Sequence, residues 1–319
     1  MTQKVIIDAD PGIGDAAAVA LAILDREVDV LGVTATAGRV SGTTATRNLQ
    51  TIIELLDPPK RPRLGSSQAG LMTFDASFGA GFTNSTALNG RTGLGNNDFQ
   101  VAELHHPHDS AKLMIELTRN SPNEVTLLTL GPLTNVKIAC ERAPEFLSLL
   151  KGLVCLGGSV EVGGDITPAA EFNVYADPMA ARSILRSPAT KTLVPLDVSG
   201  RSVLTFEQLD FVSRIAAPHM GWLLKNLLPF ALRTNHEHLG REGLPLHEVV
   251  ALAAIARPRL FESRSMPMNV EISGELTQGM TVFDRRVVRK WHSNINVLDK
   301  VDADGVLDYF TSIVGIAAA

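Results

Sequence analysis

The sequence predicts an α/β fold, in which an open, mostly parallel sheet is flanked by helices and carries a helical insertion near the C-terminal third. Over residues 1–198, short apolar β-branched segments alternate with helical segments, which is the pattern of a parallel sheet covered on both faces. Residues 205–255 read as mostly helical. The chain has 319 residues, 45% of them hydrophobic, and we expect one domain over residues 1–319.

The individual elements follow from apolar runs and from the turn residues that separate them. The expected strands are 4–7, 28–37, 63–65, 125–130, 153–156, 191–198, a hairpin of 268–272 with 280–283, and 294–298. The expected helices are 16–24, 43–56, 110–119, 134–140, 178–185, 222–232, 246–255 and 302–315. Residues 66–107 are rich in Gly, Ser, Thr and Asn and predict a long irregular region, typical of a functional loop or lid.

Composition narrows the class of protein. A net charge of −5 and a pI near 5.9 argue against nucleic acid as a partner, because phosphate binding needs a basic surface. Cys140 and Cys155 lie in apolar surroundings and fit buried thiols in a reducing compartment. We see no signal peptide and no membrane-spanning run, and therefore expect a cytoplasmic protein.

An acidic turn after the first strand is the strongest chemical signal. Asp8, Asp10 and Asp15 lie within eight residues, on either side of a Pro-Gly break. Open α/β sheets place their ligands at the carboxyl ends of the strands. Clustered carboxylates repel one another unless a cation lies among them, and oxygen ligands of this kind suit Ca²⁺ or Mg²⁺. In the alternative interpretation, Asp15 only caps the following helix and backbone donors hold Asp8.

Three further segments place polar groups at comparable turns. Residues 131–132, Gly-Pro, end a strand, where a carbonyl could bind a hard cation or where the chain simply turns. The Gly-rich loop 157–173 offers donors and acceptors suited to sugar hydroxyls, although such loops are common. His247 and Glu248 open an apolar helix, where helix capping is the alternative.

Together these segments resemble the inosine-uridine-preferring nucleoside hydrolase family over nearly the whole chain. The most specific match is Asp8-Ala9-Asp10-Pro11-Gly12-Ile13-Gly14-Asp15, followed in order by 131–135, 167–173 and 277–286. The resemblance implies a Rossmann-like nucleoside hydrolase fold. It also implies calcium-dependent hydrolysis of the N-glycosidic bond of a ribonucleoside or modified nucleoside, giving ribose and free base, by a homodimer or homotetramer.

The resemblance also implies roles for individual residues around a Ca²⁺ that binds the ribose hydroxyls and a water. The implied metal ligands are Asp8, Asp10, Asp15, the Leu130 carbonyl and Glu248. Asp10 would also take the proton from the water, and His247 would lie beside the leaving base. The implied substrate contacts are Leu156, Glu171 and Asn173, together with positions 14, 39, 89 and 165.

These last four positions depart from the family pattern. Gly14 replaces an Asp that reaches the ribose 2′-hydroxyl, Arg39 and Asp165 each replace an Asn, and Asn89 replaces a frequent His. Glu248 replaces an Asp, and its extra methylene still reaches a cation if the helix shifts slightly. The changes at positions 14 and 39 raise the local charge by about two. That charge would suit an anionic or other N-ribosyl substrate gripped by Arg39.

Two alternatives stay open at this point. In the first, Arg39 points away from the pocket, or pairs with Asp165 or another local carboxylate, and the pocket takes ordinary ribonucleosides poorly. In the second, the protein is a weakened family member that binds a ribosyl ligand without turnover. Asn235, His236 and His238 are expected between two helices, near the base side of the pocket. The chemistry itself requires a carboxylate-rich floor for oxocarbenium character, an activated water and an acid for the leaving base.

Overall fold

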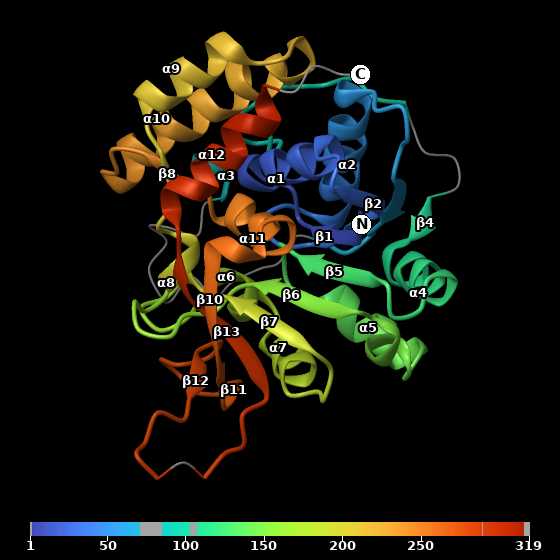
Figure 1. The fold of residues 1–319 in the computed structure, drawn as a ribbon, viewed down its shortest axis with the longest axis vertical. Coiled ribbons are helices and arrows are strands. Elements are labelled where there is room, and N and C mark those ends of the chain that lie inside the picture. Colours follow the sequence, from blue (N-terminus) through green and yellow to red (C-terminus); the bar gives the residue numbers. More distant parts are fainter. Residues whose placement is uncertain (1, 71–84, 103–106, 289, 316–319) are drawn as a thin grey trace.

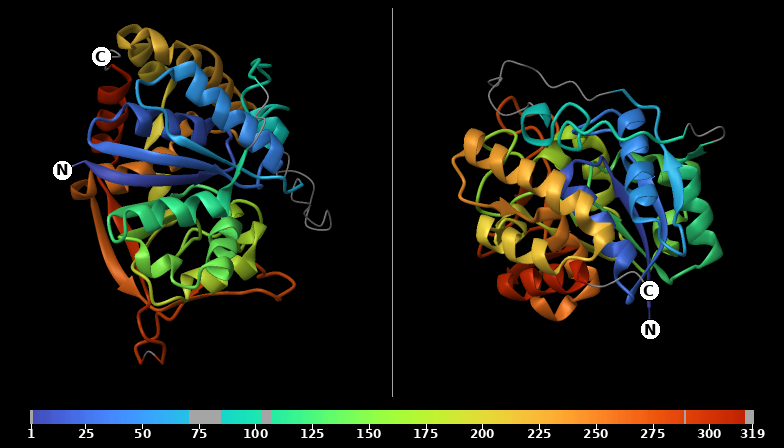
Figure 2. Two further views of the ribbon diagram at one scale, coloured as in Figure 1. Left: turned by 90° about the vertical axis from the view of Figure 1, so that its right-hand side faces the viewer. Right: turned by 90° about the horizontal axis from the view of Figure 1, so that it is seen from above.

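The computed structural model describes residues 2–70, 85–102, 107–288 and 290–315. Within these residues, nine strands form one sheet in the order β10-β13-β7-β6-β5-β1-β2-β3-β4, with helices on both faces (Figures 1 and 2). In this sheet only β10 and β13 are antiparallel to each other. The predicted α/β class is confirmed.

Most of the expected strands lie within a few residues of their expected bounds, and the structure adds further short or edge strands. The strands of the sheet are β1 (Gln3–Ala9), β2 (Val28–Ala35), β3 (Arg63–Ser66), β4 (His108–Asp109), β5 (Val125–Thr129), β6 (Gly152–Leu156), β7 (Lys191–Val194), β10 (Phe261–Met266) and β13 (Ile295–Val301). Two small antiparallel pairs are β8 (Val203–Leu204) with β9 (Leu244–Pro245), and β11 (Met268–Val270) with β12 (Thr281–Phe283).

The helices cover the two faces of this sheet. They are α1 (Ile13–Leu24), α2 (Gly42–Leu56), α3 (Ser85–Asn89), α4 (Ser110–Asn120), α5 (Thr134–Arg142), α6 (Phe172–Ala176), α7 (Pro178–Leu185), α8 (Leu196–Ser199), α9 (Phe206–Ile215), α10 (Leu228–Leu239), α11 (His247–Ala256) and α12 (Ala303–Val314). A π-helical turn, Leu223–Leu227, leads into α10, and 3-10 turns lie at Phe146–Leu149, Pro218–Met220 and Pro258–Leu260.

Strand β1 lies in the middle of the sheet, between β2 and β5. Its side chains alternate between two hydrophobic cores because successive residues of a strand face opposite ways. Val5 and Ile7 belong to the core that contains α1 and α11, whereas Ile6 belongs to the core that contains α4 and α7. Helices α1 and α11 are both rich in buried alanine and pack against each other in the first core. The end of β1 is thus fixed from both sides of the sheet.

Several elements differ from the sequence prediction; α10, for example, covers Leu228–Leu239 where a helix over 222–232 was expected. Helix α1 begins at Ile13 with Gly12 as its N-cap, so Asp15 is the third helical residue and not the cap. The strand expected over 191–198 ends at Val194, because Pro195 turns the chain into the short helix α8. Strand β10 was not predicted, since its sequence Phe-Glu-Ser-Arg-Ser-Met is largely exposed at the sheet edge and lacks an apolar pattern.

The remaining expectations have mixed outcomes. Helices α9, α10 and α11 form the helical insertion, and β11 with β12 forms the hairpin that projects from the body (Figure 1). Of the irregular region expected over 66–107, the described part contains helix α3, while 71–84 and 103–106 lie outside the described residues. The stretch with Asn235, His236 and His238 lies inside α10, and the prediction that it lies between two helices was wrong.

Helix α12 is fastened to the end of α1 by a buried polar contact. Asp25 directly follows α1, is 3% exposed and accepts a hydrogen bond from the Tyr309 hydroxyl at 3.0 Å. The Arg257 guanidinium lies 4.8 Å from the centre of the Tyr309 ring and 3.5 Å from the same carboxylate. Within the described part of the chain, none of the helices is long and apolar enough to cross a bilayer.

Candidate active site

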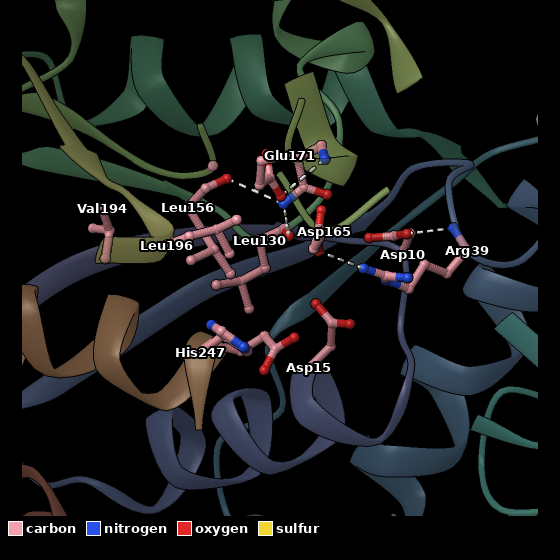
Figure 3. Close-up of a pocket in the computed structure, with 13 residues that line it drawn as sticks. Asp10, Asp15, Arg39, Leu130, Leu156, Asp165, Glu171, Val194, Leu196 and His247 are labelled. Atoms are coloured by element: carbon pink, nitrogen blue, oxygen red, sulfur yellow. Dashed lines mark hydrogen bonds and ion pairs between the residues drawn. The ribbon is translucent and has the colours of Figure 1, made fainter. Parts of the chain in front are cut away.

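A cavity opens at the carboxyl edge of the parallel strands, just beyond the ends of β1, β5, β6 and β7 (Figure 3). The space within its walls, including space that is open to solvent, is about 410 Å³. The lining residues are Asp10, Asp15, Arg39, Leu130, Leu156, Gly157, Asp165, Glu171, Asn173, Val194, Leu196, His247 and Glu248. Asp15 and His247 enter from helices on one side, and Glu171 faces them from the other (Figure 3).

Most of the residues singled out from the sequence therefore meet in one cavity. Among the described residues, Asp8, Gly14 and Asn89 are not part of its wall. Gly157, which was singled out only as part of the Gly-rich loop, also lines it, and so do Val194 and Leu196, which were not predicted. The last two could have been found from the sheet order, because β7 lies beside β6 and its end reaches the same edge.

Asp10 follows β1 directly and is 2% exposed. Its Oδ2 accepts a hydrogen bond from the backbone N–H of Arg39 at 2.6 Å. A Cβ added at Gly38 would lie 2.1 Å from Oδ2, and one added at Gly131 would lie 2.5 Å from Oδ1. Two turns therefore close on this carboxylate because both glycines lack side chains. Burial raises the pKa of Asp10 to about 7, although the Arg39 N–H and charge oppose the shift.

Asp15 and Glu248 lie in the first turns of two different helices. Asp15 Oδ2 accepts the Gly12 N–H at 3.0 Å, whereas its buried Oδ1 has no hydrogen-bond partner among the described residues. Burial, and then repulsion from Asp10 and Glu248, raises the pKa of Asp15 well above its ordinary value. Glu248 is the second residue of α11 and is partly buried. Both helix N-termini favour negative charge at these positions.

Asp8 lies beneath the cavity and is fully buried. Its Oδ1 accepts hydrogen bonds from Thr34 Oγ1 at 2.7 Å and from Asn135 Nδ2 at 2.9 Å. These donors are side chains, not the backbone groups considered from the sequence. Its Oδ2 has no partner among the described residues, and burial raises the pKa of Asp8 to about 7. Asn135, from the Gly-Pro-Leu-Thr-Asn segment, thus anchors the floor, a contact that sequence reasoning missed.

Glu171 and Asn173 are fixed on the opposite wall by α6. Glu171 is the N-cap of that helix, and its carboxylate accepts the N–H groups of Gly158 at 2.8 Å, Asn173 at 3.0 Å and Val174 at 3.2 Å. Burial, and then the nearby Asp165 charge, raises the pKa of Glu171 to about 8. Asn173 Nδ2 donates to the carbonyls of Leu130 at 2.7 Å and Leu156 at 3.1 Å. The strand ends of β5 and β6 are thereby tied together.

Arg39 and Asp165 form an ion pair at the mouth of the cavity. Arg39 Nη2 lies 3.4 Å from Asp165 Oδ2, and its guanidinium lies 4.0 Å from the centre of the Phe172 ring. Asp165 Oδ1 also accepts the Phe172 N–H at 2.8 Å. Of the alternatives drawn from the sequence, the structure shows the pairing of Arg39 with Asp165. The positive charge at position 39 is thus matched by a neighbouring carboxylate.

His247 is the first residue of α11, and its Nδ1 lies 2.8 Å from Ser199 Oγ. Burial lowers the pKa of His247 below its ordinary value, which favours the neutral ring. Asn89 accepts the Ile13 N–H through its Oδ1 at 3.0 Å and so supports the acidic turn from behind. Asn235 donates to the Ala231 carbonyl within α10 and is not among the described residues that line the cavity.

Sequence and structure comparisons agree with this geometry. The family model described as "Inosine-uridine preferring nucleoside hydrolase" matches residues 5–308. The chain belongs to this family. Uridine nucleosidase 1 of Arabidopsis thaliana is 33% identical over 318 residues, covering 96% of this chain and 91% of that protein. Pyrimidine-specific ribonucleoside hydrolase RihA of Escherichia coli K12 is 32% identical over 310 residues, covering 97% of each.

Solved structures show the same fold. The plant nucleoside hydrolase PpNRh1 has a TM-score of 0.86 at 27% identity, with 99% of both chains covered. A purine-preferring ribonucleoside hydrolase from Gardnerella vaginalis has a TM-score of 0.87 at 24% identity, with 98% of both covered, and supports the fold alone. This nucleoside hydrolase is therefore a hydrolase of N-glycosidic bonds that converts nucleosides into ribose and base.

Proposed function

We propose that this nucleoside hydrolase uses a Ca²⁺ ion to cleave a neutral ribonucleoside or modified nucleoside. The observation that carries the proposal is the cavity floor, where Asp10, Asp15 and Glu248 meet and a buried Asp15 oxygen has no partner among the described residues. A polar atom buried without a partner is costly, and a cation would satisfy it. Carboxylate oxygens and the Leu130 carbonyl are the ligands that Ca²⁺ prefers.

The donor set fits a hard cation, with one requirement. In the described part of the chain, no three His, Cys, Asp or Glu side chains are already arranged to hold a metal ion. A cation would have to draw the carboxylates of Asp10, Asp15 and Glu248 inward. The raised pKa values of Asp10 and Asp15, and the repulsion that Glu248 exerts on both, support the presence of such a partner. Asp8, one layer below, would support the site through its second oxygen.

The chain's own groups suit the two ends of the reaction. The bound ion would lower the pKa of a water and offset the charge of the floor. Asp10, held by the Arg39 N–H and with a pKa near 7, is suited to take the proton from that water. When the Ser199 hydroxyl donates to Nδ1 of His247, the ring proton lies on Nε2 and is available to the leaving base.

The proposed substrate is neutral because of the contacts that Arg39 makes. Its guanidinium is paired with Asp165 and stacked on Phe172, so an anionic substrate would have to displace a carboxylate that is already there. Glu171, by contrast, is fixed by three backbone donors on the wall that faces the floor, where it can accept a hydrogen bond from a sugar hydroxyl. The names of two relatives make uridine the first substrate to try.

The test is reducing-sugar release from uridine, inosine, 2′-deoxyuridine and uridine 5′-monophosphate, before and after chelation of calcium. We expect turnover of the neutral ribonucleosides, loss of activity on chelation and recovery when calcium is returned. Activity that survives complete chelation would remove the metal from the proposal. Silence on every substrate by a protein shown to hold calcium would indicate a member that binds a ribosyl ligand without turnover.

The Arg39→Asn variant tests the charge of the substrate separately. We expect the ratio of kcat/KM for uridine to that for uridine 5′-monophosphate to stay within a few-fold of its original value, because Arg39 and Asp165 balance each other in the unaltered protein. A selective loss of activity on the phosphorylated substrate would instead support the anionic alternative. Asp165→Asn is the matched control, since it leaves the guanidinium without its carboxylate.

A further inference from the structure

The space above Gly14 is occupied by the carboxylate of Glu248. Gly14 is the second residue of α1 and Glu248 the second residue of α11, on two helices that pack together. A Cβ added to Gly14 would lie 2.1 Å from Glu248 Oε2, 2.5 Å from Cδ and 2.8 Å from Oε1. Real Cβ atoms essentially never come within 3.0 Å of such neighbours. A side chain at position 14 would therefore require the flexible end of Glu248 to move aside.

The backbone gives no other reason for glycine at position 14. It is not one of the described glycines with a positive φ, and its conformation is helical. Glycine is among the poorest helix formers, so its presence in the first turn works against α1. The missing side chain at position 14 thus leaves room for the Glu248 carboxylate.

The position of the Glu248 carboxylate also resembles that of an aspartate at position 14. A carboxylate at position 14 would begin one bond from Cβ, and the three Glu248 carboxylate atoms lie 2.1–2.8 Å from that Cβ position, so the two carboxylates would occupy overlapping space. Within the described residues, no hydrogen bond or ion pair joins this carboxylate to another side chain or to the backbone. Its oxygens, which face the cavity, are therefore available to a ligand.

We propose that Glu248 is a specificity-determining residue, whose carboxylate accepts a hydrogen bond from one of the two vicinal ribose hydroxyls and thereby does from α11 what a carboxylate at position 14 would do from α1. The inference rests on the proposed function, because it needs a ribosyl substrate in this cavity. A carboxylate has two oxygens, so one can face the cation while the other accepts from the hydroxyl. Glu248 and the bare Gly14 then form one functional unit.

Four variants test whether the two positions depend on each other. Glu248→Asp draws the carboxylate back by one methylene, Gly14→Asp inserts a side chain against Glu248, and the double variant moves the carboxylate from α11 to α1. Glu248→Gln keeps the volume but removes the charge. Gly221→Ala is the matched control, because a Cβ there meets nothing within 4 Å among the described residues.

The readouts are the melting temperature without metal, the calcium affinity by titration calorimetry, and the ratio of kcat/KM for uridine to that for its 2′-deoxy and 3′-deoxy analogues. We expect Gly14→Asp to lower both the melting temperature and the calcium affinity. Glu248→Asp and Glu248→Gln should each lower one of the two ribo-to-deoxy ratios by at least about tenfold, the size of a lost hydrogen bond to a charged group. The double variant should recover most of all three quantities.

Two results would overturn the inference. The effects of Gly14→Asp and Glu248→Asp could add without rescue in the double variant, so that the two side chains do not share one space. Alternatively, both ribo-to-deoxy ratios could stay unchanged in the Glu248 variants while the calcium affinity falls. Glu248 would then bind only the cation and not a ribose hydroxyl. If the unaltered protein releases no sugar from any nucleoside, the proposed function fails. The inference is then tested by whether the double variant recovers the melting temperature and the calcium affinity, and by comparing the affinities for ribose and 2-deoxyribose.

Discussion

Removing calcium should make the stability of this nucleoside hydrolase fall as the pH rises from about 5 to about 7. Burial raises the pKa of Asp8 and of Asp10 from 3.8 to about 7 in the folded protein, and that of Asp15 also rises. The folded state therefore holds more protons than the unfolded state across this range. Because the free energy of unfolding falls with pH wherever the folded state binds more protons, each such group contributes a loss on the order of 1 kcal/mol per pH unit.

Calcium should reverse this dependence for the groups that bind it. A cation beside Asp10 and Asp15 favours their ionised carboxylates, so the loaded protein gains nothing by keeping those two protons. The extra stability from calcium should thus be small near pH 5 and should reach several kcal/mol near pH 7, as the sum over two or three carboxylates. Calcium binding near neutral pH should also release protons.

Urea unfolding at several pH values, with chelator and with excess calcium, measures both curves. Asp10→Asn is the control, because the neutral isostere should flatten the curve measured with chelator. Stability that is constant or rising over this pH range in the absence of calcium would show that the carboxylates are not held protonated. An equal gain from calcium at both ends of the range would refute the link between the cation and these groups.

Three further predictions follow from single contacts. Gly38→Ala should lower kcat/KM by more than about 100-fold without unfolding the protein, because its Cβ would lie 2.1 Å from Asp10 Oδ2. Gly221→Ala is the control, and equal activity of the two variants would contradict this prediction. His247→Gln should lower kcat for uridine by about 100-fold but leave kcat for p-nitrophenyl riboside almost unchanged, because that leaving group needs no proton. Equal losses of kcat on the two substrates would exclude a role of His247 as the acid. Tyr309→Phe should lower the free energy of unfolding, measured in urea, by about 2 kcal/mol, because it removes a hydrogen bond to the buried Asp25 carboxylate. A loss too small to measure would mean that Arg257 alone stabilises this carboxylate.

The fold could be read from the sequence for most of the buried elements. Strand β1 and helix α1 were predicted within a few residues because their apolar runs match their surroundings in the core. Strand β10 could not be predicted, since its pairing with β13 at the sheet edge depends on a partner that follows it in the chain and not on its own apolar pattern. Helix α8 was missed because the buried run over 191–198 hides the change of direction at Pro195.

The candidate site was predictable as a set of positions but not as a set of contacts. The acidic turn, Glu171 and His247 were found from spacing and family resemblance, and the structure places them around one cavity. What each residue touches depends on chain segments far away in the sequence. The hydrogen bond from Asn135 to Asp8 spans 127 positions and the ion pair of Arg39 with Asp165 spans 126. A local sequence pattern cannot predict contacts between residues that lie so far apart in the chain.

The packing of α1 against α11 has a consequence for how this enzyme can diverge. Asp15 projects from the start of one helix and Glu248 from the start of the other, and both helices are rich in buried alanine. Small side chains let two helices approach closely. One methyl group added between α1 and α11 would therefore increase the distance between the first turns of the two helices. Metal affinity could then be tuned by substitutions several turns from any ligand. If the proposed ion is bound, lineages that keep every acidic residue would differ in how tightly they hold it, and a comparison of the ligand residues alone would not reveal the difference.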